Sequence, residues 1–122
     1  MPEEDSLARR AYRNRTDVYR EEGDEDARTV VFAHGTLMDR TMFDSQIEAV
    51  ADAGYHAVAF NFRARTEYYE LAYDLRDLVG DTDAVLDNIG VDSCVLVGMS
   101  MGGFMGLRFA LEHQDRLDGL VL

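Results

Sequence analysis

The sequence predicts an α/β fold: a parallel sheet with helices on both faces. Two observations carry this prediction. Short apolar runs of strand length alternate along the chain with longer stretches of helical periodicity, as in successive βαβ units. In addition, a Gly-x-Ser-x-Gly sequence centred on Ser100 separates an apolar run of strand length from one of helix length, as expected where a buried strand turns sharply into a helix.

The predicted strands are continuous apolar runs, which is typical of strands buried on both faces. They are expected at residues 29–33, 56–60, 93–97 and 119–122, preceded by a short strand near residues 17–20. The acidic run at 21–26 is interpreted as a solvated turn. The acids Asp81, Asp83 and Asp87 are expected to form a second solvent-facing patch.

Helical spacing of apolar residues fills the intervals between the strands. These helices are expected at residues 41–53, 75–89 and 101–111. Asp74 is placed to cap the second helix and Gly90 to end it. Residues 1–27 therefore form a polar N-terminal arm with a first strand, and residues 28–122 form the main domain.

In a parallel sheet with right-handed crossovers, functional groups gather beyond the carboxyl ends of the strands. Three segments fall at this edge: His34-Gly35-Thr36, Asn61-Phe62-Arg63 and Ser100.

A tight turn at Ser100 would hold the serine in strained backbone geometry and expose its hydroxyl. Gly98 and Gly102 are required there because side chains would collide where the strand and helix pass. The N-terminus of the following helix favours negative charge beside Ser100.

Composition limits the class of protein. The 122 residues are 47% hydrophobic and contain no apolar run long enough to span a membrane. The net charge of −12, with arginine as the only cation, argues against nucleic acid and anionic membranes as partners. It resembles the surfaces of proteins from salt-loving microbes, although an ordinary acidic protein is the alternative. Cys94 is expected to be a buried apolar residue, and a reducing cytoplasm fits the sequence.

These segments together resemble the α/β-hydrolase family, in an incomplete form that covers roughly the N-terminal half of that fold, over residues 28–122. The resemblance implies that Ser100 is the nucleophile and that the backbone N–H groups of Met101 and Thr36 form the oxyanion hole. His34 and Gly35 would support that loop. This sequence departs from the family's Asp-x-Arg-Gly-x-Gly segment, because residues 61–66 are Asn-Phe-Arg-Ala-Arg-Thr, which keeps the arginine but not the glycines.

A serine nucleophile needs a base and an orienting acid, which in this family follow the serine in the chain. His113 lies 13 positions after Ser100 on the predicted helix, roughly 20 Å away at 1.5 Å per residue. His56 begins its strand and is expected at the wrong end of the sheet. His34 is at the same edge of the sheet as Ser100. In relatives this histidine is structural, and the alternative is that His34 acts as the base in this chain.

The terminal strand at 119–122 has no covering element, which predicts a truncated chain with an exposed strand edge. The first hypothesis is the N-terminal portion of a serine hydrolase for esters or lactones, inactive alone and acting in its parent on a small acyl substrate. The alternatives are a non-catalytic remnant or interaction module, and one half of a split hydrolase whose second chain completes the sheet. No metal or cofactor motif is present.

Overall fold

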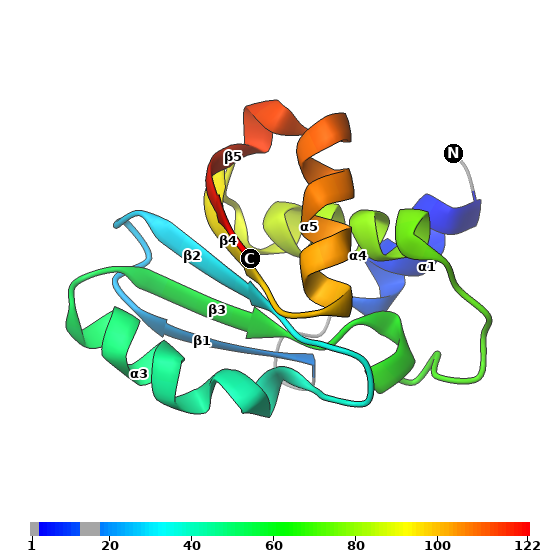
Figure 1. Cartoon of the computed structure of the whole chain (residues 1–122), viewed down its shortest axis with the longest axis horizontal. Coiled ribbons are helices and arrows are strands. Elements are labelled where there is room, and N and C mark those ends of the chain that lie inside the picture. Colours follow the sequence, from blue (N-terminus) through cyan, green and yellow to red (C-terminus); the bar gives the residue numbers. More distant parts are fainter. Residues whose placement is uncertain (1–2, 13–17) are drawn as a thin grey trace.

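A five-stranded sheet in the order β1-β3-β2-β4-β5 forms the centre of the protein (Figure 1). The computed structural model describes residues 3–12 and 18–122. The strands are β1 (Tyr19–Gly23), β2 (Thr29–Ala33), β3 (His56–Phe60), β4 (Cys94–Gly98) and β5 (Leu117–Val121). β2 to β5 run parallel, while β1 pairs antiparallel with β3.

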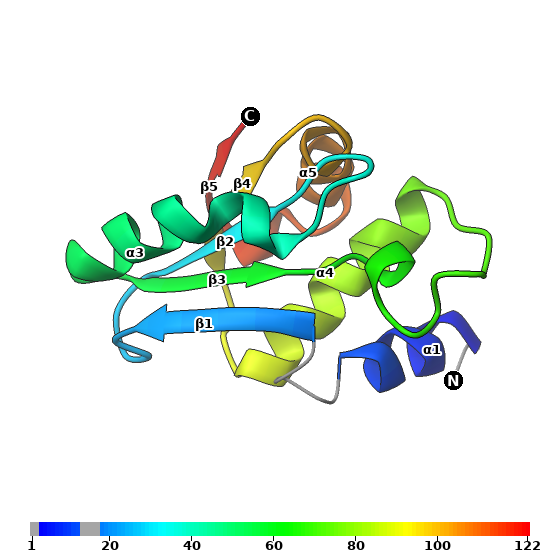
Figure 2. The ribbon, with the colours of Figure 1, turned by 90° about the horizontal axis from the view of Figure 1, so that it is seen from below.

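Helices cover both faces of this sheet. They are α1 (Glu3–Ala11), α3 (Asp44–Asp52), α4 (Leu75–Ile89) and α5 (Met101–Glu112), with 3-10 turns at Arg40–Phe43, Arg63–Arg65 and Gln114–Arg116. α3 lies on one face, and α1, α4 and α5 lie on the other (Figure 2). None of the helices in the described residues is long and apolar enough to cross a membrane.

The alternation of side chains along the central strands explains the two layers. Val31 and Ala33 pack into the larger core with α1, α4 and α5, whereas Phe32 points to the opposite core around α3. β3 divides in the same way, with Phe60 in the larger core and Ala59 in the smaller one. The predicted α/β class with helices on both faces is therefore confirmed.

The capping residues predicted from the sequence set both ends of α4. Asp74 accepts a hydrogen bond from the backbone N–H of Asp77, whose carboxylate accepts one from the N–H of Asp74, so the two form a capping box. Gly90 ends the helix in the left-handed conformation, with φ of 78°. The predicted helix at 41–53 is divided, because a 3-10 turn precedes α3.

The first strand departs from prediction in place and direction. It was expected near residues 17–20, of which residue 17 lies outside the described residues, and the structure places it at Tyr19–Gly23. The interpretation of residues 21–23 as a solvated turn was wrong, and the sheet is not wholly parallel. The physical reason is that β1 is an edge strand, so polar side chains such as Glu22 can face solvent without leaving a strand.

Candidate functional site

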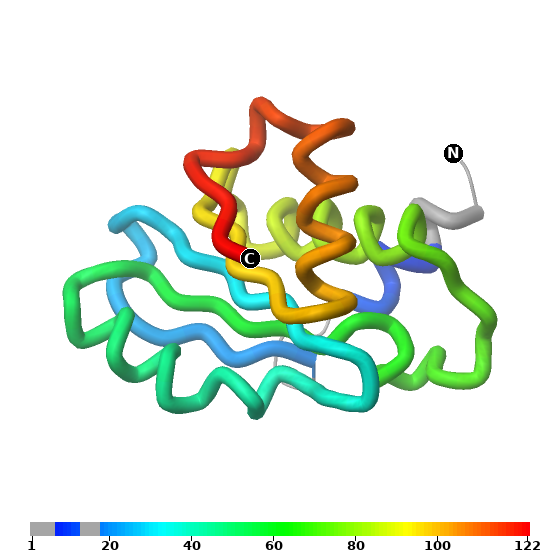
Figure 3. Tube along the Cα trace, viewed as in Figure 1, coloured from blue at the N-terminus to red at the C-terminus, as the bar shows by residue number. Residues whose placement is uncertain are grey.

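The carboxyl ends of β2, β3 and β4 and the loops that follow them meet at one edge of the sheet (Figure 3). β4 ends at Gly98 and α5 begins at Met101, so Ser100 lies on the tight turn between them, as predicted. Its side chain is exposed and its backbone has φ of 53° and ψ of −113°. A non-glycine residue in this region carries about 1–3 kcal/mol of strain, which the surrounding contacts must offset.

Close packing explains the two glycines that flank this turn. A Cβ on Gly98 would lie 2.4 Å from the carbonyl oxygen of Gly102. A Cβ on Gly102 would lie 2.2 Å from the carbonyl oxygen of Ala33, at the end of β2. Both neighbours are backbone atoms that cannot swing aside. The prediction that side chains would collide at these positions is confirmed.

The loop after β2 lies directly against the serine turn. The backbone N–H of Met99 donates to the carbonyl oxygen of Ala33 at 3.1 Å. A Cβ on Gly35 would be 3.4 Å from Cβ of Ser100, so the two loops touch. Across residues 3–12 and 18–122, no hydrogen bond engages the backbone N–H of Thr36 or of Met101. Met101, the first residue of α5, and Thr36, in the loop after β2, therefore both lie where these two segments meet at Ser100.

His34 is fixed in one tautomer by its neighbours. The backbone N–H of Phe62 donates to Nε2 at 3.0 Å, so Nε2 must be the unprotonated nitrogen. Nδ1 then carries the proton and donates to the carbonyl oxygen of Gly35 at 2.9 Å. Burial lowers the pKa of His34 and favours this neutral form. Because the Nε2 lone pair is already used, His34 has no free site to accept a proton from Ser100.

The other two histidines lie away from the serine, as predicted. His56 begins β3 at the opposite end of the sheet, with Nδ1 2.9 Å from Thr29 Oγ1 and Nε2 2.5 Å from Glu21 Oε2. His113 is the residue after the last turn of α5, and its ring packs against Phe109. A helix of this length separates His113 from Ser100 by about 18 Å, far beyond hydrogen-bond reach.

A buried ion pair follows β3. Arg63 NH2 lies 2.7 Å from Asp81 Oδ1, and the backbone N–H of Arg63 donates to Asp81 Oδ2 at 3.0 Å. Asp81 has no exposed surface, so its expected place in a solvent-facing patch was wrong. Burial raises the pKa of Asp81, while the Arg63 guanidinium opposes that shift by favouring the charged form. The signal for its burial was present, since Asp81 is three residues after Leu78 and four before Val85 on the apolar side of α4.

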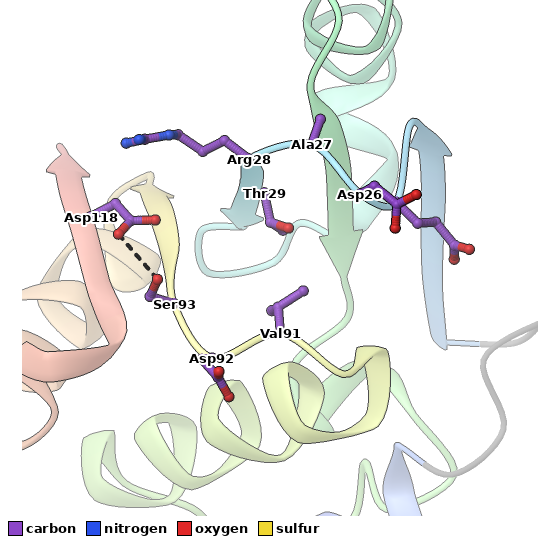
Figure 4. A pocket seen from close by; sticks show the side chains of 9 residues that line it. Asp26, Ala27, Arg28, Thr29, Val91, Asp92, Ser93 and Asp118 are labelled. Carbon is purple, nitrogen blue, oxygen red and sulfur yellow. Dashed lines mark hydrogen bonds between the residues drawn. The ribbon is translucent and has the colours of Figure 1, made fainter.

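Two hollows differ in their relation to the serine. A cavity of about 290 Å³ adjoins the turn, with lining residues that include His34, Gly35, Thr36, Tyr69, Tyr73 and Met101. A larger one, of about 610 Å³, opens at the amino-terminal ends of the strands (Figure 4). There the Ser93 hydroxyl donates to Asp118 Oδ1 at 3.1 Å, so Asp118 lies at the end of the sheet away from Ser100. The smaller cavity is the candidate substrate site.

One group of side chains has the spacing of metal ligands. Ligand atoms of Glu21, Glu25 and His56 lie within 4.8 Å of one another. The imidazole nitrogens of His56 already contact Thr29 and Glu21, and the group is at the opposite end of the sheet from Ser100. These residues have no part in the chemistry considered at the serine.

Comparison with known proteins adds the wider context. Residues 28–122 match a family profile described as alpha/beta hydrolase fold. The chain is 36% identical over 102 residues to epoxide hydrolase B of Mycobacterium tuberculosis, and 34% identical over 97 residues to rhodomycin D methylesterase of a Streptomyces species. These matches cover 80% and 75% of this chain but 29% and 33% of the two relatives.

A solved structure agrees with this assignment. It comes from a study of carboxylesterases of the thaumarchaeon Nitrososphaera gargenis, and it matches with a TM-score of 0.78 at 25% identity. The match covers 84% of this chain and 39% of that structure. The chain therefore spans about a third of the length of the proteins it is similar to.

Proposed function

Because the chain belongs to the alpha/beta hydrolase fold family, we propose that it carries the nucleophile and oxyanion donors of a serine hydrolase acting on esters or lactones. The observation that carries the proposal is Ser100, exposed at φ of 53° on a turn that two glycines hold against β2. In this role Ser100 Oγ attacks the acyl carbon, and the backbone N–H groups of Met101 and Thr36 stabilise the resulting oxyanion.

The chemistry of a serine hydroxyl favours an acyl substrate. Attack of Oγ on an ester or lactone carbonyl expels the alcohol and leaves an acyl-enzyme ester, which water can hydrolyse to restore Ser100. Attack on an epoxide would leave an ether on Ser100, and water does not hydrolyse it because an ether has no carbonyl carbon to attack. Among the named relatives, the methylesterase and the carboxylesterases are therefore better guides to the substrate than the epoxide hydrolase.

The catalytic acid and base of the proposed enzyme come from residues outside this chain. The sequence contains three histidines. The hydrogen bonds of His34 and the positions of His56 and His113 leave none of them able to accept the proton of Ser100. On its own the chain is expected to have very low activity.

Exposed apolar side chains beside an open strand edge support this proposal. Phe104 and Leu111 of α5 are 64% and 87% exposed, and Val121 and Leu122 beside β5 are 52% and 67% exposed. β5 is an edge strand with its outer backbone groups unpaired by the described strands. We propose that the rest of a hydrolase fold adds to this edge, either from the same polypeptide or from a second chain. The non-catalytic interaction module would use the same edge.

We also propose a salt-rich, reducing cytoplasm as the environment of this protein, from its composition. An excess of 24 acidic over 12 basic residues suits concentrated salt, which screens the self-repulsion of the surface. The single cysteine, buried at Cys94, suits a reducing cytoplasm.

Fluorophosphonate labelling tests the proposed function. The chain alone should label at Ser100 far more slowly than active serine hydrolases do, because no base activates Oγ. Adding a polypeptide that supplies the rest of the fold should accelerate labelling by about a hundredfold or more, the typical gain from general-base catalysis. Ser100→Ala is the control and should not label in either case. Labelling of the chain alone at the rate of an active enzyme would refute the missing base, and labelling elsewhere would refute the nucleophile.

A further inference from the structure

The N-terminal helix brings a tyrosine into the core behind the candidate site. α1 precedes residue 28, where the family match begins, and it packs against α4. Tyr12 follows α1 directly and has no exposed surface. Its ring meets Phe60 edge-on with centroids 6.0 Å apart, and its carbonyl oxygen accepts a hydrogen bond from Asn88 Nδ2 at 2.5 Å. This residue is therefore held from both its side chain and its backbone.

The Tyr12 hydroxyl is aimed at the loop after β3. It donates to the carbonyl oxygen of Asn61 at 2.8 Å. Burial, and after it the negative charge of Asp81, raise the pKa of Tyr12, so the hydroxyl remains a donor at neutral pH. Asp81 in turn binds the side chain and backbone N–H of Arg63. Residues 61 and 63 are thus both anchored from within the core.

These anchors enclose one peptide plane. The carbonyl oxygen of Asn61 and the N–H of Phe62 belong to the same peptide group, whose six atoms are coplanar. Tyr12 binds the oxygen at one end of that plane, and the N–H at the other end donates to His34 Nε2 at 3.0 Å. Fixing the carbonyl direction therefore fixes the direction in which the N–H points.

We propose that Tyr12 is a positioning residue that holds the Asn61–Phe62 peptide plane and, through His34, sets the direction of the Gly35–Thr36 peptide beside Ser100. His34 Nδ1 binds the Gly35 carbonyl oxygen, and that carbonyl shares its peptide plane with the N–H of Thr36. Two peptide planes and one imidazole thus connect the N-terminal helix to a proposed oxyanion donor. The catalytic consequence rests on the proposed function, but the structural connection does not.

Nitrogen NMR of the whole chain tests this connection without any hydrolysis. In the unaltered chain, His34 should show a protonated Nδ1 and an unprotonated Nε2. Tyr12→Phe keeps the ring packing and removes the hydroxyl. It should loosen the plane, so that hydrogen exchange of the Phe62 amide accelerates by roughly three- to tenfold, as for the loss of one hydrogen bond, and the His34 tautomers become mixed. Tyr55→Phe, at an exposed position near the opposite end of the sheet, is the matched control and should change neither signal.

Unchanged Phe62 exchange and His34 tautomer in a folded Tyr12→Phe chain would overturn the proposal. If that variant does not fold, Asn88→Ala is the second test. It keeps the Tyr12 hydroxyl but removes the hydrogen bond to the Tyr12 carbonyl oxygen, so the tyrosine is held less firmly. It should also accelerate Phe62 exchange, and no change there would equally overturn the proposal. A shifted His34 signal combined with labelling away from Ser100 would uphold the positioning role and reject the proposed function, so the two failures are distinguishable.

Discussion

Replacing Gly102 by alanine tests the packing that holds the serine turn. The new Cβ would lie 2.2 Å from the Ala33 carbonyl oxygen, 2.7 Å from the Ala33 carbonyl carbon and 2.8 Å from the His34 carbonyl oxygen. All three distances are well inside the ~3.5 Å of normal contact, and all three atoms are backbone. α5 must therefore move away from β2. The expected cost is about 1–3 kcal/mol, only partly offset by the better helix propensity of alanine.

Gly80 offers a matched control in α4. A Cβ there would meet nothing within 4 Å, so Gly80→Ala should gain about 0.5–1 kcal/mol from helix propensity alone. The two variants should then differ in free energy of unfolding by about 1.5–4 kcal/mol, which for this size of chain separates their urea midpoints by about 1 M or more. Equal midpoints for Gly102→Ala and Gly80→Ala would refute the argument that close approach, and not helix propensity, requires glycine at residue 102.

Four further results are expected. Ser100→Gly should be about 1 kcal/mol more stable to urea than Ser100→Ala, because only glycine adopts φ of 53° without strain; equal stabilities would show that the turn is relaxed. Asp81→Ala should cost about 3–5 kcal/mol in the same assay by leaving the Arg63 guanidinium buried without its partner, and a loss below about 1 kcal/mol would contradict this. Burial raises the pKa of Cys94 to about 12, so a thiol reagent near pH 8 should modify it only after unfolding. Because burial lowers the pKa of His34, its ring should stay neutral in an NMR titration as the pH falls through about 6.5, and protonation above that value would exclude the assigned hydrogen bonds.

The sequence was sufficient where a local pattern had one physical solution. The capping residue Asp74 and the closing Gly90 gave the exact bounds of α4, and the continuous apolar runs gave β2 and β3. The predicted collision at Gly98 follows from the turn itself. A first strand was predicted near residues 17–20, but the bounds of β1 could not be predicted in this way, because an edge strand with one solvated side needs no apolar pattern, and its acidic residues are typical of a loop.

Contacts between residues far apart in the sequence were the other feature that could not be predicted from the sequence alone. Asp81 belongs by spacing to the buried side of α4, but its charge favours the surface unless a partner is known. That partner, Arg63, is 18 positions away and is brought to it only by the path of the chain after β3. Tyr12 likewise meets Asn61 across 49 positions. A single sequence specifies such pairs but does not display them.

In the proposed enzyme, the geometry separates two requirements of serine catalysis: a turn that is already in place, and a base that accepts the proton of Ser100. Two backbone contacts hold the turn at Ser100: the close approach of Gly102 to Ala33 and the hydrogen bond from the N–H of Met99 to the carbonyl oxygen of Ala33. None of these contacts involves a titratable group, so the conformation of the serine turn does not depend on a group that accepts the proton of Ser100. A site preorganised in this way can stabilise developing negative charge before a base is present, although the attack itself stays slow. For this reason a polypeptide that supplies an imidazole should raise the labelling rate without changing the structure of the turn, and coordinates that show the turn remodelled on complementation would contradict that separation.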